Sequence, residues 1–224
     1  MIDDILWLTQ VKGRDLDDYL ALGWYRMGKY IFTTQLLEAP DKSKFNRVFW
    51  LRYIVDKVNF DTKTLQLWNK NKRFTVSCTP FILTPEVEAL HALYVSSLKF
   101  QTAEDLPYLL VDIKNEIFDS YIIHVRDGGK LISAGIFDKG LETIAGIINF
   151  YDPAYKAFSP GKYLMMLKYS FCKKYNIKYY YPGYYSPDYP VFDYKLFLDK
   201  AATEVYIPLF GDWVTFSVFL DEFC

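Results

Sequence analysis

Three apolar segments between residues 121 and 151 constrain the fold of this chain most strongly. The first, 121–126, has the sequence Tyr-Ile-Ile-His-Val-Arg, and the turn 127–130 that follows it is Asp-Gly-Gly-Lys. An Asp-Gly pair between apolar runs is a strong signal for a β-hairpin. Residues 131–138 supply the second strand, and residues 143–151 form a long third strand that ends before Asp-Pro. The sequence therefore predicts three consecutive antiparallel strands.

A helix and a further strand follow this sheet in the sequence. Ser159 is a good N-cap, and Pro160 suits the first position of an apolar helix that runs to about residue 175. Residues 177–181 are typical of a strand, which we expect to end at the Pro-Gly pair 182–183. The order predicts the α/β (α+β) class, with a mixed, largely antiparallel sheet flanked by helices.

The amino-terminal part gives weaker signals. A shift in composition near residues 80–105 suggests a smaller region over 1–80 and a larger domain over 81–224. The expected elements are a short acidic helix at 15–20, a turn between Gly23 and Gly28, strands at 45–58 and 73–78 joined by a basic connection, a helix at 85–94 with Thr84 as N-cap, and a short helix at 105–120.

Composition excludes several classes of protein. The net charge is −1, so the chain lacks the global positive charge typical of a DNA-binding protein, and any nucleic-acid contact must come from a local patch. No apolar run approaches the ~20 residues that cross a bilayer, and the acidic start is unlike a signal peptide. Three scattered cysteines and two histidines indicate no metal site. We expect a cytoplasmic protein that binds neither membrane nor DNA.

One segment stands out by its charge. Between Pro153 and Pro187 there is no Asp or Glu, whereas six lysines occur. The same segment contains the amino terminus of the expected helix, whose free amides suit an anion. This pattern favours a phosphate-bearing partner, such as coenzyme A or an RNA backbone. The alternative is a solvated, lysine-rich helix face balanced by acids elsewhere.

Seven features stand in order along the chain: the Gly-Trp turn 23–28, Arg52, Asp138, the strand 144–153 ending in Asp-Pro, the helix start 158–163, the Tyr-rich strand 179–184, and Tyr-Lys-Leu-Phe at 194–197. The order of strands, helix and strand resembles the layout of the GNAT acyltransferase core. Together the motifs resemble the carboxyl-terminal half of the aminoacyl-tRNA–protein transferases, the arginyl- and leucyltransferases of the N-end rule pathway.

The chain also departs from the family pattern. No cysteine precedes Cys78, although the family usually has cysteines near the Gly-Trp turn. The run 62–71 replaces a segment rich in serine and arginine, and Pro160 replaces a leucine, which removes one amide from the helix start.

The resemblance implies a reaction and its residues. An aminoacyltransferase would move arginine or leucine from aminoacyl-tRNA to the α-amino group of a protein or peptide amino terminus, expected to be acidic. Arginines pair with carboxylates, so the candidates for the acidic acceptor are Arg26 and Arg52. Asp152, Tyr151 or Tyr184 would handle the proton, although Asp152 suits a turn cap equally well. The remaining substrate-binding candidates are Ser159, Gly161, Lys162, Tyr181, Tyr194 and Lys195.

Two alternatives remain open at this stage. A CoA-dependent GNAT N-acetyltransferase would use the same helix start for pyrophosphate, with acetyl-CoA as cofactor, although the usual glycine-rich loop is reduced here to Ser-Pro-Gly-Lys. A non-catalytic binding protein would keep the fold and its lysines, with Lys195 in a structural ion pair. The transferase needs no cofactor beyond aminoacyl-tRNA as co-substrate.

Overall fold

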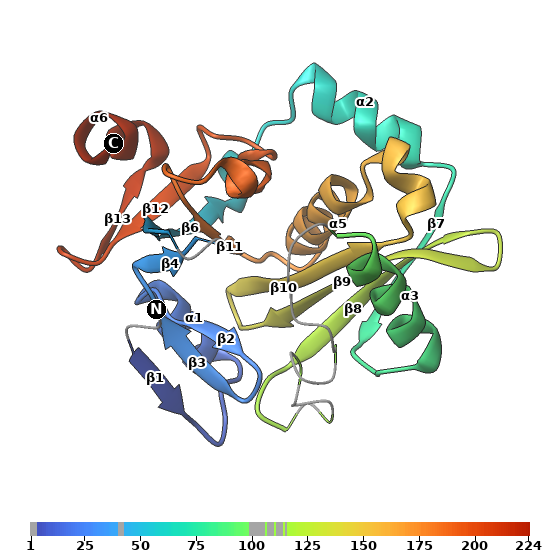
Figure 1. Ribbon diagram of the computed structural model, residues 1–224, viewed down its shortest axis with the longest axis horizontal. Helices are drawn as coiled ribbons and strands as arrows, with labels where there is room; N and C mark the ends of the chain where they lie inside the picture. The colour runs from blue at the N-terminus through green and yellow to red at the C-terminus, as the bar shows by residue number, and fades with distance from the viewer. Residues whose placement is uncertain (1–3, 40–42, 99–105, 107–109, 111–113, 115) are drawn as a thin grey trace.

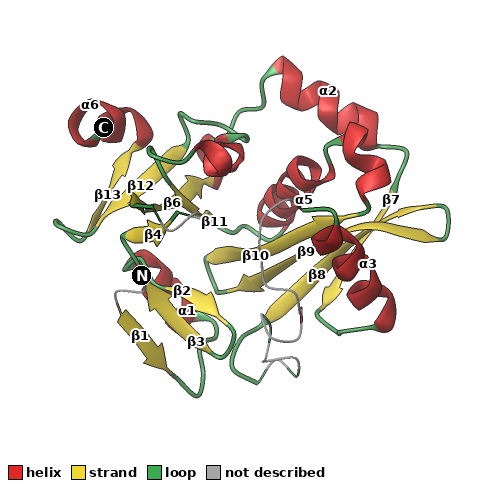
Figure 2. Ribbon diagram, in the orientation of Figure 1, coloured by secondary structure: helices red, strands yellow, loops and turns green. Residues whose placement is uncertain are grey.

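A computed structural model describes residues 4–39, 43–98, 106, 110, 114 and 116–224. The chain is a mixed α/β protein built on one eight-stranded mixed sheet with helices on both faces (Figures 1 and 2). The strands in spatial order are β13 (Asp212–Thr215), β12 (Thr203–Ile207), β6 (Phe49–Ile54), β11 (Tyr179–Tyr185), β10 (Thr143–Tyr151), β9 (Lys130–Lys139), β8 (Ser120–Asp127) and β7 (Thr75–Pro80). All neighbours are antiparallel except β10 and β11.

The predicted hairpin and third strand are confirmed. Asp127 pairs with Lys130 across the turn between β8 and β9, and β9 pairs antiparallel with β10. The sheet takes strands from both predicted regions, 1–80 and 81–224, and the division into two domains stays a prediction.

Helix α5 (Pro160–Lys174) covers one face of the sheet and α3 (Pro85–Ser96) the other. Successive side chains of a strand point to opposite faces of the sheet, so neighbouring residues pack in different cores. Ile123 and Phe137 pack in the α5 core, whereas their neighbours Ile122 and Ile136 pack in the α3 core. Thr84 caps α3 as predicted, because its side chain accepts a hydrogen bond from the Val87 amide.

Two local predictions in this region are wrong. Ser159 does not cap α5 with its side chain, because its backbone is left-handed at φ 49°. Strand β11 does not end at Pro182; it continues to Tyr185. The strand tolerates the proline because its register against β6 shifts between Tyr180 and Gly183.

The basic connection at residues 62–71 is the helix α2 (Thr62–Asn71), with Asp61 as N-cap. Sequence reasoning missed this helix, which packs beside α5 (Figure 1). The helix expected at 105–120 falls largely outside the described residues. No helix of the described part is both long and apolar enough to span a membrane.

The amino-terminal part adds a small sheet in the order β1 (Asp4–Trp7), β3 (Tyr30–Thr33), β2 (Tyr25–Met27), next to α1 (Arg14–Ala21). The segment expected to be only a turn between two glycines therefore contains the strand β2. The remaining elements are β4 (Leu36–Glu38), β5 (Phe45–Arg47), α6 (Phe216–Phe223) and the short 3-10 helices η1 (Val55–Lys57), η2 (Pro153–Phe158) and η3 (Pro190–Leu196).

Candidate functional site

The site forms where the parallel strands β10 and β11 separate. They pair only from Thr143 to Ala145 on β10, opposite 179–181 on β11, although both strands continue further. The hydroxyl of Tyr25, from β2, lies 2.8 Å from the carbonyl oxygens of both Gly146 and Tyr181. Burial raises the pKa of Tyr25 well above its ordinary value, so this hydroxyl stays protonated. It bridges the two strands where they separate, one carbonyl oxygen on each strand.

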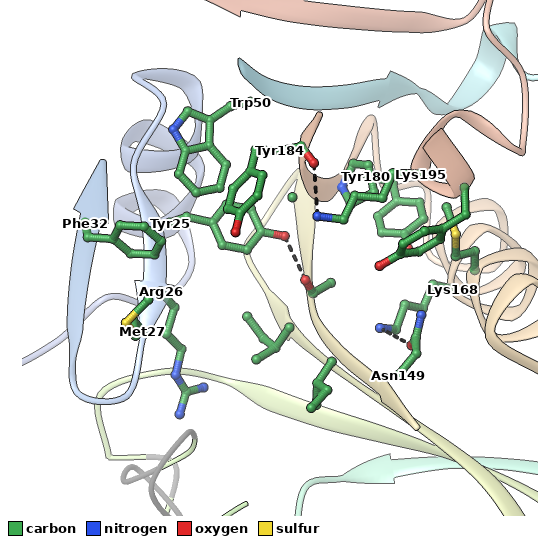
Figure 3. A pocket seen from close by; sticks show the side chains of 17 residues that line it. Tyr25, Arg26, Met27, Phe32, Trp50, Asn149, Lys168, Tyr180, Tyr184 and Lys195 are labelled. Carbon is green, nitrogen blue, oxygen red and sulfur yellow. Dashed lines mark hydrogen bonds between the residues drawn. The ribbon is translucent and has the colours of Figure 1, made fainter. Parts of the chain in front are cut away.

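A pocket of about 490 Å³ opens at this point (Figure 3). Its described lining contains no Asp or Glu. The lining residues are Tyr25, Arg26, Met27, Phe32, Trp50, Gly146, Ile147, Ile148, Asn149, Met165, Lys168, Tyr180, Pro182, Gly183, Tyr184, Tyr194 and Lys195.

Lys168 enters the pocket from α5 and is 1% exposed. Its Nζ donates to the carbonyl oxygen of Ile136 at 2.8 Å and to Oδ1 of Asn149 at 2.9 Å. Within the described residues it has no ion-pair partner. Because burial disfavours the charged form, the pKa of Lys168 falls to about 7.

Lys195 enters the same pocket from η3, on the side opposite Tyr25 (Figure 3). Its Nζ donates to the carbonyl oxygen of Tyr184 at 3.0 Å and lies 4.5 Å and 4.8 Å from the ring centres of Tyr184 and Phe192. Burial lowers the pKa of Lys195 to about 7. The two ring faces favour its ammonium form.

Part of the pocket wall is aromatic, and Lys195 lies against the Tyr184 ring of this wall. Trp50 of β6 stacks on Tyr25 with ring centres 4.8 Å apart, and Phe32 and Tyr184 meet Trp50 edge-on. Burial raises the pKa of Tyr184, so its hydroxyl remains a donor at neutral pH. The pocket thus combines a rigid apolar wall with two amines.

The predicted arginine ligands are both held by carboxylates. The guanidinium of Arg26 is buried, donates to Asp138 and Ser120 at 2.8 Å each, and lies over the Phe118 ring. Arg26 therefore lines the pocket, but its charge is engaged inside the protein.

Arg52 does not reach the pocket. Its Nε lies 2.7 Å from Glu204 Oε2, and its guanidinium sits between the rings of Tyr179 and Trp213 at 4.3 Å and 4.4 Å. Tyr181 is buried and its ring also packs against Trp213. Neither side chain is among those that line the pocket.

The carboxylate of Asp152 caps a turn. It accepts from the Ala154 amide at 2.9 Å and from Lys130 Nζ at 2.6 Å, and the Lys130 ammonium lowers the pKa of Asp152. The ring of Tyr151 packs against Tyr94 on α3. Neither residue lines the pocket.

Ser159, Gly161 and Lys162 lie at the start of α5, outside the pocket. Lys162 instead lines a second cavity, and its Nζ lies 4.8 Å from the Phe197 ring centre. Tyr194 borders both cavities. Of the predicted site residues, the structure brings together Arg26, Tyr184, Tyr194 and Lys195.

Sequence reasoning missed Lys168 and Asn149. A usable signal existed, because Lys168 lies in the apolar helical stripe of Leu164 and Cys172, where a charge is unexpected. Asn149 likewise interrupts the apolar strand β10. Across the part of the chain that the structure describes, no cluster of His, Cys, Asp and Glu suits a metal ion.

The sequence of this chain matches a known family. A sequence model of the family "Arginine-tRNA-protein transferase, C terminus" matches residues 29–202. A relative named aspartate/glutamate leucyltransferase, from Campylobacter jejuni, is 26% identical over 179 residues, covering 75% of this chain and 70% of its own. Its namesake from Methylobacillus flagellatus is 22% identical over 168 residues, covering 73% and 65%.

Two solved structures are similar at low sequence identity. FemX has a TM-score of 0.47 at 10% identity and covers 82% of this chain and 63% of its own. L-PGS from Bacillus licheniformis has a TM-score of 0.44 at 12% identity and covers 80% and 52%. The family model and the leucyltransferase relatives confirm the predicted family and the prediction of a transferase. The chain belongs to the arginine-tRNA-protein transferase family.

Proposed function

We propose that this protein transfers an aminoacyl group, arginyl or leucyl, from aminoacyl-tRNA to the α-amino group at the amino terminus of a protein. The observation that carries the proposal is the pocket between β10 and β11, with two amines and no carboxylate in its described lining. It is supported by the family and by the leucyltransferase name of the relatives. Charged tRNA would place the reaction in the cytoplasm.

The geometry suits acyl transfer on a GNAT-like core. Beyond Ala145 the edge of β10 no longer pairs with β11, so an extended substrate can lie along it. The ester of aminoacyl-tRNA is already activated, so positioning and stabilisation of the oxyanion supply most of the catalysis, and no further cofactor is needed. The protonated hydroxyl of Tyr184 is a suitable oxyanion donor.

The tRNA would approach over α2 and the start of α5. Lys156 lies in η2 and Lys162 in the first turn of α5. The packed helix α2 adds Lys63 and Lys70, and Lys72 follows at its carboxyl-terminal cap. The other end of the lysine segment is neutralised, because Lys173 and Lys178 pair with Asp56 and Glu142. The acceptor end of the RNA would therefore lie against α2 and the start of α5.

The acidic acceptor would be recognised by Lys195. Both predicted arginines already have carboxylate partners, whereas the partners of Lys195 among the described residues are a carbonyl and two rings. A carboxylate from an amino-terminal Asp or Glu would accept a charge-assisted hydrogen bond from the Lys195 ammonium.

A transfer assay tests the proposal. The purified protein is incubated with tRNA charged with radiolabelled arginine or leucine and with peptides that begin with Asp, Glu, Lys or Ala. We expect label in the Asp and Glu peptides. The Lys195→Gln variant, with Lys200→Gln on the exposed turn as matched control, should lose the preference for acidic peptides. No label from any charged tRNA into any peptide, with folded protein, would refute the function.

A further inference from the structure

Lys168 is a buried amine with no ion-pair partner among the described residues. It lies in the middle of an apolar helix, 1% exposed, and its described polar contacts are the neutral oxygens of Ile136 and Asn149. Burial of an ammonium without an ion-pair partner is costly. A leucine or methionine would fill the same helical stripe without that cost, so packing alone does not account for a lysine here.

The neighbouring strands make room for this amine. A Cβ at Gly135 of β9 would lie 2.7 Å from Asn149 Oδ1 and 3.3 Å from Lys168 Cε. A Cβ at Gly146 of β10 would lie 3.5 Å from Lys168 Nζ. Gly146 and Lys168 both line the pocket, so a glycine without a side chain lies beside the nitrogen there.

We propose that Lys168 is the proton acceptor of the transfer reaction, which makes it a catalytic residue of the function proposed above. A lysine ammonium has three N–H donors and no lone pair, so the neutral amine that remains after loss of one proton has two N–H groups and one lone pair. The oxygens of Ile136 and Asn149 accept both N–H groups, so the lone pair of Nζ takes part in neither hydrogen bond. Gly146 lies beside this nitrogen. Figure 3 shows Lys168 hydrogen-bonded to Asn149 at the edge of the pocket.

The step balances in atoms and electrons. The α-amino nitrogen of the acceptor attacks the ester carbon, forming the C–N bond and an oxyanion, while Lys168 Nζ takes one proton from that nitrogen. The oxyanion then collapses, the bond from carbon to the ribose oxygen breaks, and Lys168 returns its proton to that oxygen. The products are an amide and a tRNA with a free ribose hydroxyl, and Lys168 is neutral again.

The surroundings of Lys168 favour a neutral amine near neutral pH, where a general base is most effective. Burial lowers its pKa to about 7, and Asp138 and Cys78 oppose this shift. Asp138 is itself paired with Arg26. The other titratable groups that face the pocket are Tyr25, Tyr180, Tyr184, Tyr194 and Lys195.

The other pocket groups suit proton acceptance less well. Burial raises the pKa of Tyr25, Tyr180 and Tyr184, so their hydroxyls are donors at neutral pH. Burial lowers the pKa of Lys195 to about 7 as well. Its Nζ lies against two aromatic rings, however, and these favour the charged form.

The test compares Lys168→Met with Lys174→Met, an exposed lysine on the same helix. In single-turnover transfer we expect Lys168→Met to lower the rate constant about 10²–10⁴-fold, with KM for both substrates within twofold of wild type. The wild-type rate should rise with pH through about 7. The variant should lose this limb and keep only the rise at about pH 8 that comes from the acceptor's own α-amino group. Methylamine or ethylamine should restore part of the activity in Lys168→Ala. Lys174→Met should match wild type.

Wild-type rates and an unchanged pH limb in folded Lys168→Met would overturn the inference while leaving the proposed function intact. If Lys168→Met fails to fold, Lys168→Gln and amine rescue of Lys168→Ala decide the question. Titration of ¹³C-labelled lysines by NMR, assigned with these variants, is a separate readout. A Lys168 amine still charged at pH 9 would overturn the inference whatever the activity. A wild-type protein inactive with every charged tRNA would instead refute the proposed function, and this inference with it.

Discussion

The two arginines and the two lysines of this protein differ in what surrounds their charges. Arg26 lies within 2.8 Å of Asp138, and Arg52 within 2.7 Å of Glu204. Lys168 and Lys195 have only carbonyl, amide and ring partners in the described structure. A buried cation paired with a carboxylate is satisfied before any ligand arrives. A buried amine with neutral partners can still take a proton or a carboxylate.

The arginine side of this comparison predicts the largest effect on folding. Arg26→Met leaves Asp138, which is fully buried, without its cation. Breaking a buried ion pair from one side typically costs about 3–5 kcal/mol, and we expect that loss in the free energy of unfolding by urea.

The double variant Arg26→Met/Asp138→Leu is the matched control. It removes both charges, so it should recover part of the loss. If Arg26→Met alone unfolds at the same urea concentration as wild type, the ion pair does not stabilise the fold. The proposed difference between the paired arginines and the unpaired lysines would then be wrong.

The lysine side predicts a dependence of stability on pH. In the folded protein the pKa of Lys168 is lowered from 10.5 to about 7. Between these values the unfolded chain binds one proton more than the folded chain, so stability rises with pH. The slope from this group approaches about 1.4 kcal/mol per pH unit, or roughly 2–3 kcal/mol between pH 7 and pH 9. The curve for Lys168→Met should be flatter by that amount, and parallel curves would show that Lys168 titrates normally.

A third prediction separates Lys195 from Arg52 in the choice of acceptor. A hydrogen bond to a charged group contributes about 1.5–3 kcal/mol, so Lys195→Gln should raise KM for an Asp-initiated peptide by about tenfold or more. The KM for an Ala-initiated peptide should stay the same. Wild-type KM for the Asp peptide should rise above pH 7, because Lys195 loses its proton there.

Arg52→Gln is the control for this selectivity, because Glu204 already holds that guanidinium outside the pocket. Its KM for the Asp peptide should stay within twofold of wild type. A loss of acidic preference in Arg52→Gln but not in Lys195→Gln would reverse the assignment.

The sequence carried the local signals of this fold but not its long-range pairings. The Asp-Gly turn at 127–128 fixes a hairpin by itself, and the apolar run after Pro160 fixes a helix, so both were predicted. The pairing of Arg26 with Asp138 joins residues 112 apart in the chain. The residue type predicted that Arg26 binds a carboxylate of the substrate, but the folded structure shows that it binds the carboxylate of Asp138 in the same chain.

Polar residues inside apolar helices and strands could have predicted two residues of the pocket. Lys168 and Asn149 each interrupt such an element, and the fold brings them within 2.9 Å. The helix α2 was missed for the opposite reason, because its few apolar residues and many polar ones are typical of a connection as well as of an exposed helix. Local pattern therefore located most of the scaffold, and contacts between distant strands decided the site.

The smallest effect we predict tests the start of α5, which belongs to neither the arginine nor the lysine group. If the Ser159 side chain capped the helix, Ser159→Gly would lose a few tenths of a kcal/mol and Ser159→Ala about 1 kcal/mol. The left-handed backbone of Ser159 and its missing side-chain cap predict the opposite sign for glycine, because glycine adopts φ 49° without strain. Ser159→Gly should therefore raise stability by up to about 1 kcal/mol, or roughly 2–4 °C in Tm, and Ser159→Ala should be near neutral. Thr84→Ala on α3, where the cap bond exists, should lose about 1 kcal/mol in the same thermal unfolding experiment.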